Sequence, residues 1–233
     1  MLHYAQDSFA EKTGVLFHNP ALLLEALTHK SYATEYGLKA DNQRLEVLGD
    51  AVLQLVSTDY IFSKYHEHCE GPMSEIRSAM TRQETLAKFA KHLDIHNLIL
   101  LGKGEEKTGG REKISILADA FEAIIGALYL DSGLETVRKF LIPLFETLCP
   151  HPEKLYFEMN PKGALQEFLQ AKYKQKPEYR LVNAQGPDHD KSFTVSVIIN
   201  GKAIASATAS SLKSAESAAA AQAFDILTRK EQK

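Results

Sequence analysis

The sequence predicts an all-α domain followed by a smaller α+β domain with the element order α-β-β-β-α. Apolar residues recur at helical spacing through about the first 148 residues, whereas strict apolar alternation appears only in the last third of the chain. The charge changes as well. From Asn160 onward there are 11 Lys and Arg and 7 Asp and Glu, a formal charge of +4, while the part before it carries −7. This asymmetry indicates two domains with different partners, the basic one suited to a polyanion.

Composition excludes several classes of protein. Hydrophobic residues make up 44% and charged residues 24% of the chain, which is ordinary for a globular domain and unlike collagen or a disordered tail. The two cysteines, Cys69 and Cys149, are too few for a disulfide scaffold, so we expect free thiols in a reducing compartment. The sequence shows no signal peptide and no apolar run near the roughly 18 residues that span a bilayer. We therefore expect a cytoplasmic protein without a membrane partner.

The first domain is predicted to contain helix after helix. Gly, Lys and Glu dominate the stretch from Gly102 to Lys113, which predicts a loop. The segment Cys149–Pro161 carries three prolines, which indicates a linker. We accordingly expect a first domain at residues 1–148, a linker at 149–160 and a second domain at 161–233. The predicted helices of the first domain cover Pro20–Thr28, Leu45–Thr58, Glu84–Leu93, Ile116–Leu130 and Leu134–Leu148.

The second domain is predicted to be a small sheet flanked by two helices. Its clearest strand starts at Phe193, after which every second residue is apolar as far as Ile199. Asn200 and Gly201 follow directly and form a strong hairpin signal. The predicted elements are a helix at Lys162–Tyr173, strands at Tyr179–Asn183, Phe193–Ile199 and Ala203–Ala209, and a helix at Ser211–Leu227.

Two predicted helices carry carboxylates in an otherwise apolar sequence. The only charged residues of the second predicted helix are Glu46 and Asp50, spaced i, i+4 and therefore on one face. The only charged residues of the fourth predicted helix are Asp119 and Glu122, spaced i, i+3. The fourth helix is apolar nearly all round and should be largely buried. Because carboxylates are rarely buried without a partner, these four residues need an explanation.

Two interpretations of the four carboxylates remain open at this point. Each pair can be neutralised by Arg or Lys, or can face water. Alternatively the four converge, in which case they repel one another unless a cation joins them. Oxygen ligands alone suit Mg²⁺ or Mn²⁺. Neither helix has the Glu-x-x-His pair of a di-iron bundle, and no Cys or His clusters with these carboxylates as a zinc site requires.

A family resemblance is carried by residues 42–53, Asn-Gln-Arg-Leu-Glu-Val-Leu-Gly-Asp-Ala-Val-Leu, which resemble the signature of the ribonuclease III family. The last 70 residues resemble a double-stranded-RNA-binding domain. Together the resemblances cover nearly the whole chain in the family's domain order. The reinforcing segments are Leu27–Tyr32, Leu101–Glu105 and Asp119–Gly126 in the first domain, and Leu165–Glu167, Gly186–His189, Phe193–Val195 and Ala215–Glu216 in the second.

The resemblance implies a helical endonuclease domain that forms a homodimer and cleaves double-stranded RNA with Mg²⁺, for which Mn²⁺ can substitute. The implied products have 5′-phosphate and 3′-hydroxyl ends with short 3′ overhangs, and each subunit cuts one strand. The family's metal-binding residues fall on Glu46, Asp50, Asp119 and Glu122, with Asp50 and Glu122 most closely tied to catalysis. This chemistry needs water to attack phosphorus in line while the 3′ oxygen leaves, so metal ions can serve without a side-chain nucleophile.

Two positions depart from the family pattern in the endonuclease part. The family usually has Glu where this chain has Gln43, and that position, like Glu70, is auxiliary near the RNA or the dimer partner. Glutamine keeps the hydrogen-bonding shape but loses the charge, so we expect activity to persist. The family's usual Phe is Val47 here. In relatives that ring packs into the other subunit, so we expect a repacked or weaker dimer contact.

The resemblance also assigns RNA contacts in the second domain. Proteins read A-form RNA through its shape, phosphates and 2′-hydroxyls. One departure is Leu212, where the family usually has the first of two lysines, so the expected affinity is lower. The implied contact residues are Gln166, Glu167 and Gln170 in one minor groove, His189 in the next, and Lys213 at the phosphates.

Three classes of function fit parts of the sequence. The first is a catalytic ribonuclease that processes ribosomal RNA precursors and other structured transcripts. The second is a non-catalytic RNA-binding protein on the same scaffold, which should have lost at least one of the four carboxylates. The third is a helical metalloenzyme acting on small molecules, which the basic second domain disfavours. All four carboxylates are kept, and this favours the ribonuclease.

Overall fold

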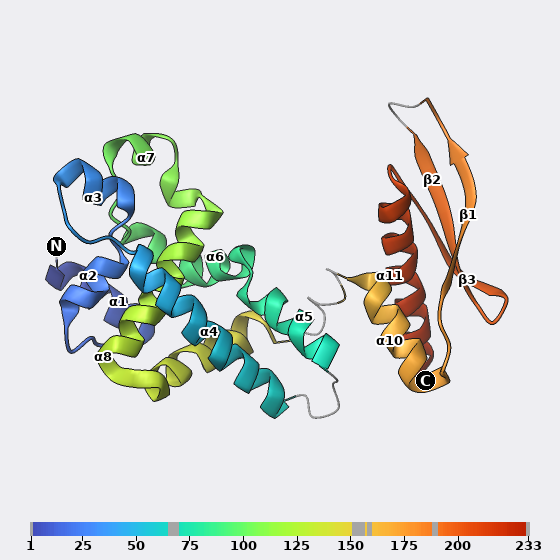
Figure 1. Ribbon diagram of the computed structural model, residues 1–233, viewed down its shortest axis with the longest axis horizontal. Coiled ribbons are helices and arrows are strands. Elements are labelled where there is room, and N and C mark those ends of the chain that lie inside the picture. The colour runs from blue at the N-terminus through green and yellow to red at the C-terminus, as the bar shows by residue number, and fades with distance from the viewer. Residues whose placement is uncertain (1, 65–69, 151–156, 158–159, 188–190, 232–233) are drawn as a thin grey trace. The chain divides into compact units, whose positions relative to one another are not determined.

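A computed structural model describes residues 2–64, 70–150, 157, 160–187 and 191–231. Its contacts divide the chain into two compact units, Met1–Pro152 and Glu153–Lys233. The first unit is helical and the second combines two helices with a sheet (Figure 1). The fold class predicted from the sequence is therefore confirmed. No helix in the described ranges is both long and apolar enough to cross a membrane.

The first unit is built around helix α8 (Ile114–Leu148), which packs against α4 (Gln43–Lys64), α6 (Gln83–His92) and α2 (Pro20–Ala26). The burial expected for the fourth predicted helix is observed in α8, where Leu117 and Phe121 are fully inaccessible to solvent. The remaining elements are α1 (Leu2–Thr13), α3 (Lys30–Tyr36), α5 (Glu70–Thr81), α7 (Lys103–Lys107) and the 3₁₀ turns η1 (Ile95–Asn97) and η2 (Gly110–Glu112).

Helix α8 is two helices joined at a kink. Gly133 has φ 77° and ψ 176°, a backbone conformation that is essentially confined to glycine. The predicted helices Ile116–Leu130 and Leu134–Leu148 correspond to the two halves of α8. The chain changes direction at the kink, which is visible at the lower end of α8 in Figure 1.

The stretch from Gly102 to Lys113 was expected to be a loop, and this prediction is wrong in detail because α7 and η2 lie within it. Side chains hold these short elements in place. Arg111 donates hydrogen bonds to the carbonyl oxygens of His96 and Ile99, at 2.8 and 2.9 Å, and pairs with Glu106. A five-residue helix fixed by such contacts leaves no periodic signal in the sequence.

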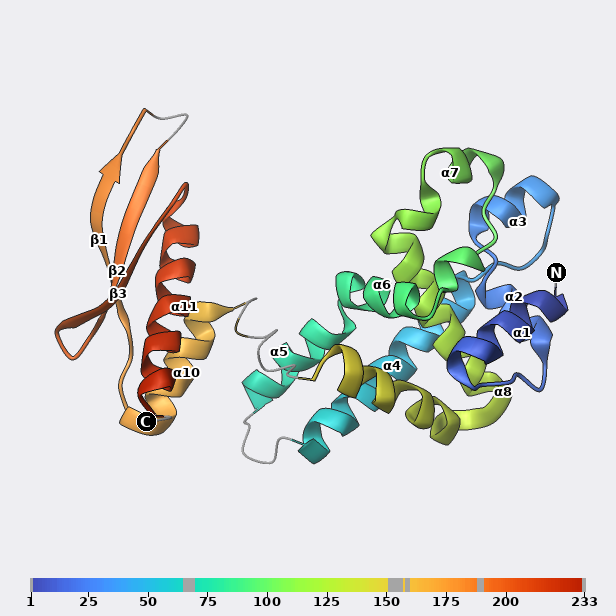
Figure 2. The same cartoon turned by 180° about the vertical axis from the view of Figure 1, so that it is seen from behind.

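The second unit has the predicted α-β-β-β-α order: α10 (Pro161–Tyr173), β1 (Glu178–Gln185), β2 (Ser192–Ile199), β3 (Lys202–Ala209) and α11 (Leu212–Glu231). The strands form an antiparallel sheet in the order β1-β2-β3. Helices α10 and α11 cover one face of the sheet (Figure 2), where Leu165, Val197 and Ala219 belong to one buried core. The predicted hairpin turn is present, with positive φ at both Asn200 and Gly201.

Candidate metal centre and RNA-binding surfaces

Helices α4 and α8 touch through two glycines. A Cβ placed on Gly49 would lie 1.7 Å from the carbonyl oxygen of Glu122, and one placed on Gly126 would lie 2.2 Å from the carbonyl oxygen of Leu45. No side chain fits at either position, because real Cβ contacts are not this short. The backbones of the two helices therefore pack directly against each other next to the carboxylates that each helix carries.

This crossing brings together three members of the acidic quartet, which we define as Glu46, Asp50, Asp119 and Glu122. Glu46, Asp119 and Glu122 each offer a carboxylate oxygen, and these atoms lie within 4.8 Å of one another. All three side chains are half-buried. Three converging carboxylates present only oxygen donors, which is the ligand type that Mg²⁺ and Mn²⁺ prefer. The residues present therefore fit a divalent cation of this class.

Asp50 lies beside the other three carboxylates without joining their group. Its side chain is exposed, and its Oδ1 accepts a hydrogen bond from Gln54 Nε2 at 3.4 Å. Its charge still contributes to raising the pKa of Glu122. The structure thus gathers three of the four carboxylates tightly and places the fourth at the solvent side of the cluster.

The raised pKa values of three members of the quartet show that the cluster lacks a positive counter-charge. Burial raises the pKa of Glu122 to about 8, and the charges of the other three carboxylates act in the same direction. Burial also raises the pKa of Glu46 and of Asp119. Without a counter-charge Glu122 therefore tends to hold a proton at neutral pH. A divalent cation would remove the repulsion and keep the carboxylates ionised.

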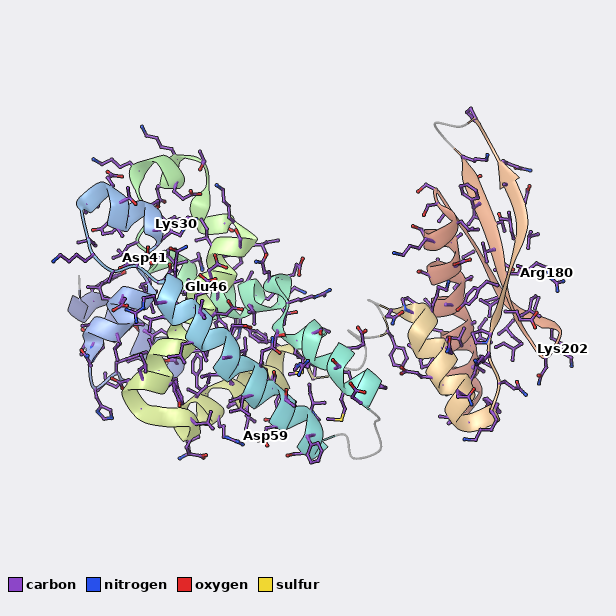
Figure 3. All side chains as sticks on the ribbon, in the orientation of Figure 1. Lys30, Asp41, Glu46, Asp59, Arg180 and Lys202 are labelled. Atoms are coloured by element: carbon purple, nitrogen blue, oxygen red, sulfur yellow. The ribbon has the colours of Figure 1, made fainter. Side chains whose placement is uncertain are left out.

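Lys30, at the start of α3, brings positive charge toward the quartet, whereas burial lowers the pKa of the neighbouring His29. Lys30 lowers the pKa of both Glu46 and Asp119, against the dominant effect of burial, and His29 does the same for Asp119. Figure 3 labels Lys30 and Glu46 with Asp41 near the beginning of α4. In the sequence, His29 stands out only as part of a family motif. Nothing in local sequence indicates that it lies near Asp119, 90 positions away.

His29 is held in place by a short network. Its side chain is buried, and its Nδ1 accepts from the backbone N–H of Ser31 at 3.2 Å, which caps α3. The hydroxyl of Ser31 lies 2.8 Å from the same Nδ1 and accepts from the N–H of Gly102 at 2.9 Å. A Cβ at Gly102 would lie 2.7 Å from the carbonyl oxygen of Ser31. The two family motifs that contain His29 and Gly102 are thus joined beside the quartet.

The other predicted residues of the first unit lie on the surface. Gln43 is exposed at the first position of α4, where its N–H donates to Asp41 Oδ1 at 3.1 Å. Glu70 begins α5 and lines a groove of about 370 Å³ together with Phe62 and Arg77. Val47 is 72% exposed. None of these three residues belongs to the group of carboxylates that could hold a metal ion.

An exposed apolar stripe runs along α4. It consists of Val47, Leu55 and Phe62, whose exposed fractions are 72%, 52% and 66%. Spacings of eight and seven residues place all three on one face of the helix. Large apolar side chains gathered in this way on a surface typically mark a protein interface.

Four of the predicted RNA-contacting residues of the second unit lie on its two helices. Gln166 and Gln170 are exposed on α10, where Glu167 is half-buried. Lys213 is exposed in the first turn of α11. His189 lies outside the described residues. The start of α11 is capped, since Ser211 Oγ accepts from the N–H of Ser214 at 3.1 Å. This leaves an ordered helix N-terminus beside a lysine, an arrangement suited to a phosphate.

Comparison with known proteins matches both units. A family model described as Ribonuclease-III-like matches residues 19–147, and a Double-stranded RNA binding motif matches residues 161–227. A protein named Ribonuclease 3 from a Nitratiruptor species is 42% identical over 221 residues, covering 95% of this chain and 96% of its own. Another Ribonuclease 3, from Bacillus cereus, is 44% identical over 223 residues, covering 94% of this chain and 90% of its own.

A solved structure agrees with the first unit. The nuclease domain of ribonuclease III from Campylobacter jejuni, described as flexible in a region involved in dimer formation, matches with a TM-score of 0.59 and 40% identity. The match covers 62% of this chain and 98% of that one. Fold and matches together define an endoribonuclease with a helical nuclease domain and a double-stranded-RNA-binding domain. The chain belongs to the ribonuclease III family.

Proposed function

We propose that this protein is a Mg²⁺-dependent endoribonuclease that hydrolyses phosphodiester bonds of double-stranded RNA to 5′-phosphate and 3′-hydroxyl ends with short 3′ overhangs. The observation that carries the proposal is the group of carboxylate oxygens of Glu46, Asp119 and Glu122, all within 4.8 Å of one another. With a pKa of about 8 for Glu122, this cluster is poorly neutralised by the protein itself. A divalent cation supplies the missing charge.

The proposed roles follow from position. Glu46, Asp119 and Glu122 hold the cation, and Asp50, at the solvent side, completes the ligand set through its own oxygen or through water. When bound, Mg²⁺ lowers the pKa of an attacking water and stabilises the leaving 3′ oxygen. Asp50 and Glu122 orient that water, and we propose them as the catalytic residues. The residues at 29–31 keep α3 and the loop at Gly102 against the cluster.

We further propose that two copies pair through the apolar stripe on α4. A twofold dimer would provide two centres, one for each strand of a duplex, which is what staggered paired cuts require. Val47 replaces a larger aromatic residue of the family, so Leu55 and Phe62 would provide most of the apolar area. Gln43 and Glu70 would lie near the RNA or the partner subunit, as auxiliary residues.

The second unit is proposed to hold the duplex. Gln166, Glu167 and Gln170 would contact one minor groove, His189 the next, and Lys213 the phosphates between them. The formal charge of +4 from Asn160 onward supports this role. Functional domain limits of 1–148 and 161–233, with a linker at 149–160, are part of the same proposal. So are a cytoplasmic location and a role in processing ribosomal RNA precursors and messenger RNA.

The test is cleavage of an end-labelled RNA duplex by the full-length protein with Mg²⁺, with Mn²⁺ or with EDTA. We expect staggered products bearing 5′-phosphate in the presence of either metal and intact duplex in EDTA. Glu84→Gln serves as a control, because Glu84 is exposed on α6 outside the quartet. Binding without cleavage under all conditions would instead support the non-catalytic alternative. Equal cleavage in EDTA would exclude a metal-dependent mechanism.

A further inference from the structure

The first unit contains a groove that the proposed nuclease reaction does not use. Its volume is about 670 Å³, and it lies between the end of α1, the end of α6 and the second half of α8. No residue of α4 lines it, nor any residue of α8 before Ser132. The groove is therefore separate from the acidic quartet, whose members lie on α4 and at positions 119 and 122 of α8.

The charged and titratable side chains that line this groove are all basic. They are Lys12, His18, His92 and Lys139, and no Asp or Glu is among the lining residues. This contrasts with the net negative charge of the same part of the chain. Lys139 is exposed and makes no ion pair within the described residues. The groove thus presents positive charge and no acidic ligand, which favours an anion over a metal cation.

Two carboxylates beside the groove are engaged by residues that line it. Asp94 pairs with Lys12 at 2.6 Å, and so offsets that lysine. Asp131 accepts from the backbone N–H groups of His18 and Asn19, at 3.0 and 2.7 Å. The positive charge available to a ligand therefore comes mainly from Lys139, with the two histidine rings as further hydrogen-bond donors.

The rest of the lining combines hydroxyl groups with apolar surface. Ser132 and Thr136 lie where the second half of α8 begins, just around the kink at Gly133. The carboxylate of Asp131 lies at this end as well, where its Oδ2 accepts a hydrogen bond from the hydroxyl of Ser132 at 2.6 Å. Phe140 and Leu144 are buried and supply apolar lining. The groove thus offers the ammonium group of Lys139 to a phosphate and apolar surface to an organic group.

We propose that this groove binds a small phosphorylated ligand of nucleotide size. Pockets for small organic ligands typically span about 300–1,000 Å³ and combine apolar lining with a few polar groups, which is the arrangement found here. The same chemistry is offered by a free nucleotide and by the phosphorylated end of a single RNA strand. Binding at this groove goes beyond the nuclease reaction and does not depend on the acidic quartet.

The proposal is tested by titrating AMP into the full-length protein by calorimetry, in EDTA so that no metal at the quartet can hold the phosphate. We expect one AMP per chain, and at least tenfold weaker binding of adenosine. Lys139→Glu should weaken AMP binding at least tenfold. The matched control is Lys107→Glu, since Lys107 is an exposed lysine of α7 outside the groove and should not change affinity.

Four further measurements decide the interpretation. His92→Gln should also weaken AMP binding, and melting temperatures should show that each variant is folded. Lys213→Glu should leave AMP binding unchanged; loss of binding in that variant would place the phosphate in the second unit and overturn the proposal. Competition by a dinucleotide with a 5′-phosphate, compared with its 5′-hydroxyl form, identifies whether RNA ends are accepted. No AMP binding at millimolar concentration, or binding unaffected by Lys139→Glu, would also overturn it.

Discussion

A Cβ on Gly49 would lie 1.7 Å from the backbone carbonyl oxygen of Glu122, so helix α4 and helix α8 have no room for a side chain between them. Glu46 and Asp50 flank Gly49 on its own helix, and Glu122 is itself the contact on the other. The geometry of the carboxylate cluster is therefore set by a backbone-to-backbone contact. Packing and the proposed metal site therefore depend on the same few backbone atoms.

Replacement of Gly49 by Ala should separate the two helices. Backbone atoms cannot rotate away as a flexible side chain could, so we expect a loss of about 3 kcal/mol or more in the free energy of unfolding, at the upper end of overpacking costs. Mg²⁺ affinity should fall as well. Urea unfolding and metal titration measure both effects. In the control variant Gly104→Ala, the added carbon meets no atom within 4 Å on α7, and stability should be unchanged or slightly higher. Equal stability of the two variants would contradict this account.

Glu122→Gln should separate catalysis from binding. Glutamine preserves the shape of the side chain and removes one charge from the cluster, so water alignment and metal binding suffer while the second unit is unaffected. We expect duplex affinity within a few-fold of normal and cleavage at least about 10²-fold slower. Filter binding and single-turnover cleavage on one preparation give both numbers. A salt-bridge role for Glu122 predicts instead that melting temperature and RNA binding fall together.

Stability of the metal-free protein should decrease as the pH rises from about 4.5 to about 8. The pKa of Glu122 is raised from 4.5 to about 8 in the folded chain, so the folded state holds a proton that the unfolded state releases. The stabilisation that this proton gives the folded state is at its full value below about pH 4.5 and is lost as the pH rises through about 8. Melting curves in EDTA should show a melting temperature that falls over this pH range. The variant Glu122→Gln should show a flatter dependence of melting temperature on pH.

Addition of Mg²⁺ provides the complementary check on this pH dependence. Binding of the cation should expel the proton, so calorimetry near pH 7 in two buffers of different ionisation enthalpy should report proton release. Melting temperature should rise with Mg²⁺ mostly at the upper end of the pH range. Identical pH profiles in Glu122→Gln and the unmodified chain would contradict the assignment.

Leu55→Asp should weaken the proposed dimer. Leu55 is 52% exposed in the centre of the apolar stripe, and a charge there would be buried against the same stripe of a second copy. We expect the variant to sediment as a monomer at micromolar concentration and to lose paired cuts. Leu181→Asp is the matched control, because Leu181 is 49% exposed on β1 of the second unit. If both variants behave alike, the stripe on α4 is not the interface.

A chain that ends at Pro150 should keep Mg²⁺-dependent cleavage but lose affinity for RNA. The loss should be largest at physiological salt, because phosphate contacts weaken as salt competes. Gel-shift titrations at two salt concentrations measure it, with cleavage at low salt as the check on the active centre. Duplex affinity that does not change on shortening would show that the second unit is not the main RNA-binding part.

Several of the longer elements were predicted from the sequence, but the twelve-residue helices α1 (Leu2–Thr13) and α5 (Glu70–Thr81) were not. The strand expected at Phe193–Ile199 lies within β2 (Ser192–Ile199), because one face of the sheet is buried and the alternation is strict. Helix α3 (Lys30–Tyr36) was not predicted. It has seven residues and is defined by the His29 cap and by Gly37 in the left-handed conformation, so its pattern is too short to register as periodic.

The candidate site could be predicted in its residues but not in its geometry. The four carboxylates stood out because the helices that carry them are otherwise apolar. The convergence of Glu46, Asp119 and Glu122 depends on the contact between Gly49 and Gly126, which sequence spacing does not reveal. For the same reason the position of His29 near Asp119 could not be read from the chain, and the roles of all these residues stay predictions.

The kink at Gly133 has a consequence for how the first unit opens. Amide protons in a helix exchange with solvent when the segment that holds them unfolds locally. Gly133 interrupts the ladder of hydrogen bonds within α8, and Pro143 has no amide proton to add to it. Residues 134–148 should therefore exchange as a separate cooperative segment, faster than residues 114–132, which are anchored by the contact of Gly126 with α4. A single glycine would thus divide the longest helix of the protein into two regions of different local stability.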